Sequence, residues 1–171
     1  WTGTMMLFGE LALLNEAQGK QYINSFNTLL SWMKNYPLKT NKWGPFFEDI
    51  PGWSDTQTNA ITFAMFIMQH RELFPDWQKD VKGIIDWTHS ALGNREYLKY
   101  KVEVMNEQTV YLVPGNSHSS RQASVELMYS QLSGDTTYRA NAIRMLNWAT
   151  YTVAADGRNR YIRDDIWLTD G

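Results

Sequence analysis

Three segments of the chain share one spacing of apolar residues. Each begins at an aromatic residue and reaches a tryptophan ten positions later, in Tyr22–Trp32, Trp77–Trp87 and Tyr138–Trp148. The positions four, seven and eight after each aromatic anchor are apolar in all three segments. At about 100° per residue these positions fall on one broad face of a helix. The pattern therefore predicts three amphipathic helices with the same buried stripe.

A more apolar helical segment precedes each of these helices, and glycine or proline marks the turn between the two. The expected first helices are about Thr4–Ala17, Asp55–Leu73 and Ser117–Leu132. A helix that is apolar nearly all round is covered on both sides. The first helices should therefore form an inner layer and the amphipathic second helices an outer layer.

The chain thus reads as one all-α domain of three αα-hairpins, at about 4–35, 55–92 and 117–155. Its long connections, 36–54 and 93–116, are the segments most expected to carry function. Apolar and polar residues alternate in Lys99–Val104 and again in Thr109–Val113. This alternation predicts a small β-hairpin in the second connection.

Composition narrows the classes of function. A net charge of −2 argues against nucleic acid as a partner, and no apolar run is long enough for membrane insertion. The lack of cysteine excludes disulfides and thiolate chemistry. Eight tryptophans exceed the needs of such a core, and surplus aromatic side chains in loops are typical of sugar stacking, although helix packing accounts for many of them.

Apolar inner helices, amphipathic outer helices and long aromatic loops between hairpins resemble the α/α-toroid (six-hairpin) superfamily of carbohydrate-active enzymes. The resemblance implies a poly- or oligosaccharide partner and a site on the face where the loops converge. Three hairpins are about half of such a ring. We therefore expect either missing flanking hairpins or an open arc that forms a homo-oligomer. We also expect a mature or trimmed piece of a bacterial periplasmic or secreted protein.

The first connection carries aromatic and acidic residues that suit sugar binding. The substrate-binding candidates are Trp43, Glu48, Asp49 and Trp53. Packing of the loop and a solvated acidic surface are the alternative explanations. Ser54 followed by Gln57 has the spacing of a capping box at the start of a helix, which would explain Ser54 and Asp55 structurally.

The second connection contains the most pointed group of candidates. Asn116 or Ser117 is expected to cap the following helix, which would place His118 and Arg121 in its first turn. A helix N-terminus keeps a histidine neutral, as a base requires, and a cation there calls for an anionic partner. The remaining candidates in this connection are Tyr111, as base or acid, and Glu107, for substrate binding. Structural capping and ion pairing are the alternative explanation.

The end of the chain supplies a third group, with Tyr161 as a catalytic candidate and Arg160 and Trp167 as substrate-binding candidates. A salt-bridged surface connection is the alternative. His70 and His89 lie late in helices, where a favourable contact with the helix dipole explains them, so they are assigned no chemistry. No metal site and no cofactor are expected from these patterns.

Three functions remain open. In a polysaccharide lyase acting on uronate-containing glycans, Asn116 and Arg121 would hold the carboxylate, His118 or Tyr111 would be the base and Tyr161 or Tyr111 the acid. In a glycoside hydrolase, two carboxylates would do the work. Their pool is Glu48, Asp49, Asp55, Glu107, Asp164 and Asp165. The third function is a non-catalytic glycan-binding or assembly module. The group around His118 favours the lyase.

Overall fold

The structure is a computed structural model of the chain, and it describes residues 2–14, 17–39, 46–47, 54–151 and 153–158. The chain is mostly helical, as the hydrophobic pattern predicts, with one small two-stranded sheet in the described part. Its contacts divide it into two compact units, Trp1–Trp43 and Gly44–Gly171.

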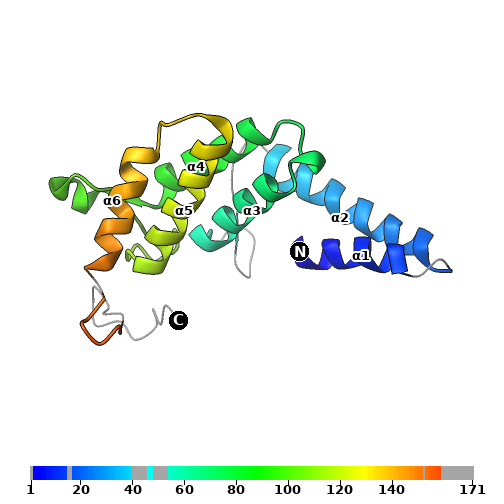
Figure 1. Ribbon diagram of the computed structural model, residues 1–171, viewed down its shortest axis with the longest axis horizontal. Helices are drawn as coiled ribbons and strands as arrows, with labels where there is room; N and C mark the ends of the chain where they lie inside the picture. The colour runs from blue at the N-terminus through cyan, green and yellow to red at the C-terminus, as the bar shows by residue number, and fades with distance from the viewer. Residues whose placement is uncertain (1, 15–16, 40–45, 48–53, 152, 159–171) are drawn as a thin grey trace. The chain divides into compact units, whose positions relative to one another are not determined.

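The first unit is a single helix pair. Helix α1 (Thr2–Leu14) and helix α2 (Gly19–Lys39) run side by side (Figure 1). Met5 of α1 and Met33 of α2 are buried, and the ring of Phe8 stacks on Tyr22 with the centroids 6.3 Å apart. The predicted stripe of α2 is only half-buried, so this pair has a thinner core than the repeat implies.

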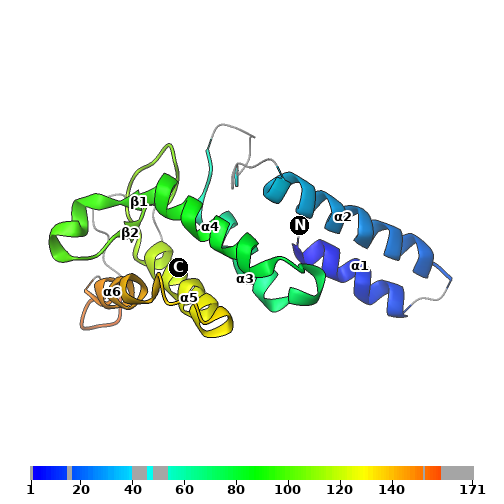
Figure 2. The ribbon, with the colours of Figure 1, turned by 90° about the horizontal axis from the view of Figure 1, so that it is seen from above.

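The second unit contains the other two pairs. Helix α3 (Gln57–Gln69), the short 3₁₀ helix η1 (Arg71–Leu73) and helix α4 (Trp77–Leu92) form one pair. Helices α5 (Asn116–Ser133) and α6 (Arg139–Thr150) form the other and lie side by side in both views (Figures 1 and 2). The first helices of the two pairs, α3 and α5, also pack against each other. Within this unit they are therefore the more central helices.

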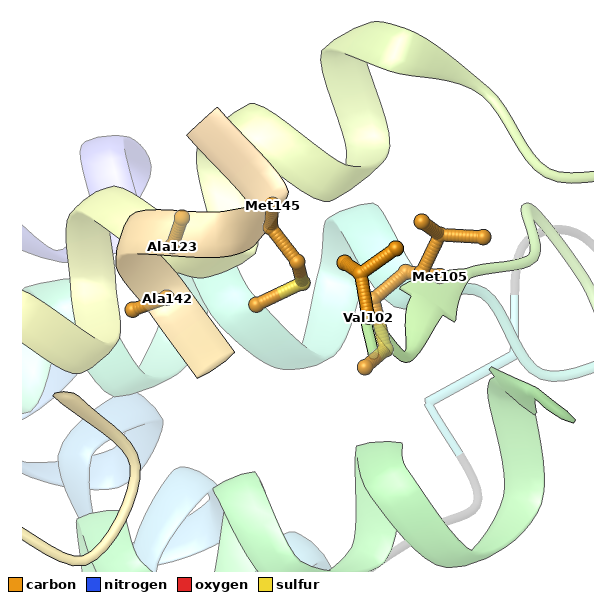
Figure 3. Close-up of a cluster of buried hydrophobic side chains, with 6 residues drawn as sticks. Val102, Met105, Ala123, Ala142 and Met145 are labelled. Carbon is orange, nitrogen blue, oxygen red and sulfur yellow. The ribbon is translucent and has the colours of Figure 1, made fainter. Parts of the chain in front are cut away.

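Burial follows the predicted stripe in the second unit. On α4 the stripe residues Val81, Ile84 and Ile85 are fully buried, and on α6 so are Ala142 and Met145. Figure 3 shows Ala142 and Met145 of α6 gathered with Ala123 of α5 and with Val102 and Met105 from the connection. The connection between the pairs thus contributes to the core, which fixes its position on α5 and α6.

The sheet lies in the predicted connection but on other residues. Strand β1 (Gly93–Asn94) pairs antiparallel with strand β2 (Val104–Met105), in the register Gly93 with Met105 and Asn94 with Val104. Most of Lys99–Val104 is not a strand, because Arg95–Tyr100 forms the 3₁₀ helix η2. The predicted pairing of Lys99–Val104 with Thr109–Val113 was therefore wrong. The alternation at the end of Lys99–Val104 instead reflects a loop in which Val102 and Val104 are buried and residues 99–101 before them are exposed.

Two predicted helix caps were also wrong. Helix α3 is capped by Thr56, whose side chain accepts a hydrogen bond from the backbone N–H of Asn59 at 3.3 Å. Ser54 does not cap it, because its hydroxyl donates to Gln108 Oε1 at 2.9 Å. Helix α5 begins after Gly115, which has extended backbone, so Asn116 and Ser117 lie inside the helix.

Candidate functional site

The N-terminal end of α3 is joined to the connection that precedes α5. Thr56 forms an antiparallel bridge with Gln108, and the backbone N–H of Gln57 donates to the carbonyl of Glu107 at 3.0 Å. The segment 106–114 closes on itself through a bridge between Asn106 and Pro114. The end of the first connection and the second connection, far apart in the sequence, are therefore joined at this end of the α3–α5 contact. We refer to the segment 106–114 as the strap.

Asp55 stands where the strap meets α3. Its backbone N–H donates to Thr109 Oγ1 at 3.1 Å, and its carbonyl accepts from the N–H of Thr109 at 3.0 Å. Both bonds use the backbone of Asp55, so they do not involve its carboxyl group. Its Oδ1 atom is buried and has no hydrogen-bond partner among the described residues. This burial raises the pKa of Asp55 above its ordinary value, because the charged form loses hydration.

Hydrogen bonds hold both the backbone and the side chain of Glu107 on the strap. Its N–H donates to the carbonyl of Val113 at 3.1 Å. Gln108 donates from Nε2 to Glu107 Oε1 at 3.4 Å and accepts from Ser54 at its own Oε1. A chain of polar groups thus runs from Ser54 beside Asp55 to the carboxylate of Glu107. Asp55 and Glu107 are two carboxyl groups on two segments that are hydrogen-bonded to each other.

The candidates at the start of α5 differ in their access to solvent. His118 is only 7% exposed, and its carbonyl accepts a hydrogen bond from Gln57 Nε2 at 3.2 Å. Arg121 is exposed and donates from Nη1 to Thr58 Oγ1 on α3 at 2.9 Å. Tyr111 is half-buried on the strap. Arg121 is thus better placed to meet a ligand than His118.

The other candidate residues lie outside the description of the structure. These are Trp43, Glu48, Asp49, Trp53, Arg160, Tyr161 and Trp167, together with Asp164 and Asp165 of the acidic pool. Asn116 is placed as the first residue of α5, but its side chain also lies outside the description.

Several described aromatic residues serve helix packing. Trp87 contacts Phe46 with the ring centroids 5.2 Å apart. Trp148 meets Tyr97 edge-on at 5.5 Å, and Trp77 meets Tyr129 in the same way at 6.3 Å. The packing alternative therefore holds for these tryptophans.

The sequence interpretation missed a buried ionic cluster centred on His89. Its Nδ1 lies 2.8 Å from Glu103 Oε2, and its Nε2 lies 2.7 Å from Glu126 Oε1. Burial alone would lower the pKa of His89, but the hydrogen bonds and negative charges of the two glutamates outweigh it and raise the pKa to about 9. The ring is therefore a cation at neutral pH and does not act as a base. The helix-dipole explanation was incomplete.

This cluster continues into the α3–α5 contact through buried amides. Gln122 Nε2 donates to Glu126 Oε1 at 2.8 Å and to Thr88 Oγ1 at 2.8 Å. Gln57 Nε2 donates to Gln122 Oε1 at 3.1 Å. Gln57, Gln122 and Glu126 are all fully buried. Polar residues four positions apart on a predicted inner helix, Gln122 and Glu126, are the signal in the sequence that pointed to such a network.

In the described part of the chain, no group of three or more His, Asp or Glu side chains is arranged to hold a metal ion. The same residues contain no helix with the length and apolar character needed to cross a membrane. Comparisons with protein-family models, with curated proteins and with solved structures found no match.

Proposed function

We propose that this protein is a carbohydrate-active enzyme of the α/α-toroid type, in which Asp55 and Glu107 cleave glycosidic bonds by hydrolysis. The observation that carries the proposal is the buried, unpaired Oδ1 of Asp55 at the junction with the strap. Carboxyl groups with a pKa raised by burial cluster at sites of acid–base chemistry. The helix pairs and the aromatic content of the chain support a glycan as the substrate class.

The chemistry needs two carboxyl groups in different protonation states. Asp55, whose pKa is raised, would donate its proton to the leaving glycosidic oxygen. Glu107, on the strap, would act as the partner carboxylate, either by taking a proton from the attacking water or by attacking the sugar directly. In both variants one water adds across the broken bond.

The geometry favours hydrolysis over elimination. A lyase with His118 as its base needs that ring to be accessible to the sugar, and His118 is almost fully buried, whereas Asp55 is only half-buried. Arg121 is an exposed cation on the neighbouring first turns, fixed through Thr58 of α3. It would pair with the carboxylate of an acidic sugar, so uronate-containing glycans remain the proposed substrates.

Substitution of the two carboxyl groups tests this proposal. Asp55→Asn and Glu107→Gln should each reduce the release of reducing ends from uronate polysaccharides at least a hundredfold, because each removes one half of the acid–base pair. Asp76→Asn is the matched control: this exposed residue also precedes a helix, and its side chain makes no cap hydrogen bond. Its activity should equal that of the wild type.

His118→Ala separates the two reaction types. This variant should retain most of the activity, because His118 neither donates nor accepts a proton in the proposed reaction. Loss of activity in His118→Ala with full activity in Asp55→Asn would replace hydrolysis by elimination. Retention of a glycan on an affinity gel without product from any variant would indicate a binding module.

A further inference from the structure

The side chain of His89 joins elements that are distant in the sequence. His89 lies in the last turn of α4, Glu103 lies just before β2, and Glu126 lies on α5. Both ring nitrogens are used, at 2.8 Å and 2.7 Å. The backbone of Glu103 is held in turn by Asn141 of α6, which accepts from its N–H and donates to its carbonyl, both at 3.0 Å. Helices α4 and α5 and the connection therefore meet at one imidazole, and α6 holds the connection through Asn141.

Burial makes this contact depend on charge. Glu126 is fully buried, its Oε1 accepts from His89 and Gln122, and its Oε2 has no hydrogen-bond partner among the described residues. His89 is the cation in hydrogen-bond contact with it. A buried carboxylate that loses its paired cation is strongly destabilised. Removal of the proton from His89 would therefore take away the positive charge that lies against the buried carboxyl group of Glu126.

Two other cations lie near His89, and each pairs with a carboxylate other than Glu126. From α4, Lys82 pairs with Asp86 and donates to the hydroxyl of Tyr138, while that hydroxyl donates to Asp86. Tyr138 stacks its ring on His89 with the centroids 5.7 Å apart. On the connection, exposed Arg95 lies 3.7 Å from Glu103 Oε1. The other titratable groups that act on Tyr138, besides Asp86, are Tyr129 of α5 and Asp135, and neither carries a positive charge.

We propose that Glu103, His89 and Glu126 form a pH-sensitive latch that fastens the connection 93–105 to α4 and α5. In the closed state the imidazolium bridges two carboxylates. In the open state the neutral ring no longer compensates them, and β1, η2 and β2 separate from α5. Because the connection leads directly into the strap, opening would also loosen the segment that carries Glu107.

The direction of the pH effect follows from the two pKa shifts. The pKa of His89 is raised from 6.5 to about 9, so its stabilisation is complete below about pH 6.5 and is lost as the pH rises through 9. The hydrogen bond from His89 lowers the pKa of Glu103 more than burial raises it, so its stabilisation is present at neutral pH and is lost in acid. The latch is therefore closed between these limits and opens in alkali.

Hydrogen exchange detected by mass spectrometry tests the latch without reference to activity. After correction for intrinsic exchange rates, protection of the peptide 93–106 should fall at least tenfold between pH 6 and pH 9.5, while α3 stays protected. His89→Gln should have low protection at both pH values. His70→Gln, which changes a half-buried histidine near Glu72, should behave as the wild type. Equal protection at both pH values, or the same alkaline loss in His89→Gln, would overturn the latch.

A second measurement does not require a folded variant. In the wild-type protein, the imidazole resonances of His70, His89 and His118 can be followed by NMR. One of the three should titrate near pH 9, with nuclear Overhauser contacts to the ring of Tyr138. If the histidine that contacts Tyr138 titrates near pH 6.5, the latch is not charged at neutral pH and the proposal fails.

Discussion

At the residue scale, the chain places charge and amide groups where an apolar core was expected. Gln57, Gln122 and Glu126 are fully buried, yet they lie on the two central helices of the second unit. Buried polar groups are tolerated when they form hydrogen bonds. The side-chain amide of Gln122 forms three, with Gln57, Thr88 and Glu126. The specificity of the α3–α5 contact therefore rests on this network as well as on apolar packing.

Gln122→Ala should destabilise the second unit by about 2–3 kcal/mol, because Thr88, Gln57 and Glu126 would each lose a partner in a buried site. Urea denaturation followed by circular dichroism at pH 7 measures the change. Gln131→Ala is the matched control, since Gln131 lies on the same helix but is exposed. A loss below about 0.5 kcal/mol, the usual range for a surface site, would show that the network contributes little.

The candidate site was only partly predictable at this scale. Glu107 and Asp55 were in the candidate pool because carboxylates on loops suggest acid–base work. The segments that carry them are joined by two hydrogen bonds between Asp55 and Thr109, one of them to the Thr109 hydroxyl, and no local sequence pattern predicts such bonds. His89 was explained by a contact with the helix dipole, and its actual partners, Glu103 and Glu126, are 14 and 37 positions away. Long-range partners of this kind are set by tertiary packing.

At the scale of elements, the helices follow the 3.6-residue pattern closely, and their ends follow less closely. The turn at Gly134 was expected from its glycine, and its backbone is left-handed with a φ of 79°. The cap of α3 was misjudged because Ser54 finds a tertiary partner in Gln108. The strands were misjudged because two-residue strands leave almost no periodic signal, and their position is set by contacts of the connection with α5.

Gly93 links the end of α4 to β1 and is a sensitive point of this arrangement. A Cβ atom there would lie 2.5 Å from Glu103 Oε1 and 2.5 Å from the carbonyl oxygen of His89. Gly93→Ala should therefore cost about 1–3 kcal/mol of stability through forced displacement of the connection. The free energy of unfolding at pH 7 measures the effect.

Gly3→Ala is the comparison for this prediction, because a Cβ atom at Gly3 of α1 meets nothing within 4 Å. It should leave stability unchanged or raise it slightly, since alanine favours helices. Equal stabilities of the two variants would mean that the connection moves freely at Gly93.

At the scale of the whole molecule, the chain combines a helix pair in its first unit with two interlocked pairs in its second. The apolar stripes and turns of the sequence predicted a mostly helical chain, and the structure confirms that class. That these pairs belong to a ring of the α/α-toroid type is a proposal, and so is a glycan as the substrate. The described part of the proposed site, by contrast, lies within the second unit and can be tested directly.

The chemistry of the product tests the central claim most directly. The protein is incubated with uronate-containing polysaccharides, and the oligosaccharides are analysed by mass spectrometry and by ultraviolet absorbance. Hydrolysis by Asp55 and Glu107 predicts saturated oligosaccharides that have gained one water per cleavage and show no new ultraviolet absorbance. Unsaturated products that absorb in the ultraviolet, formed without the addition of water, would contradict the account.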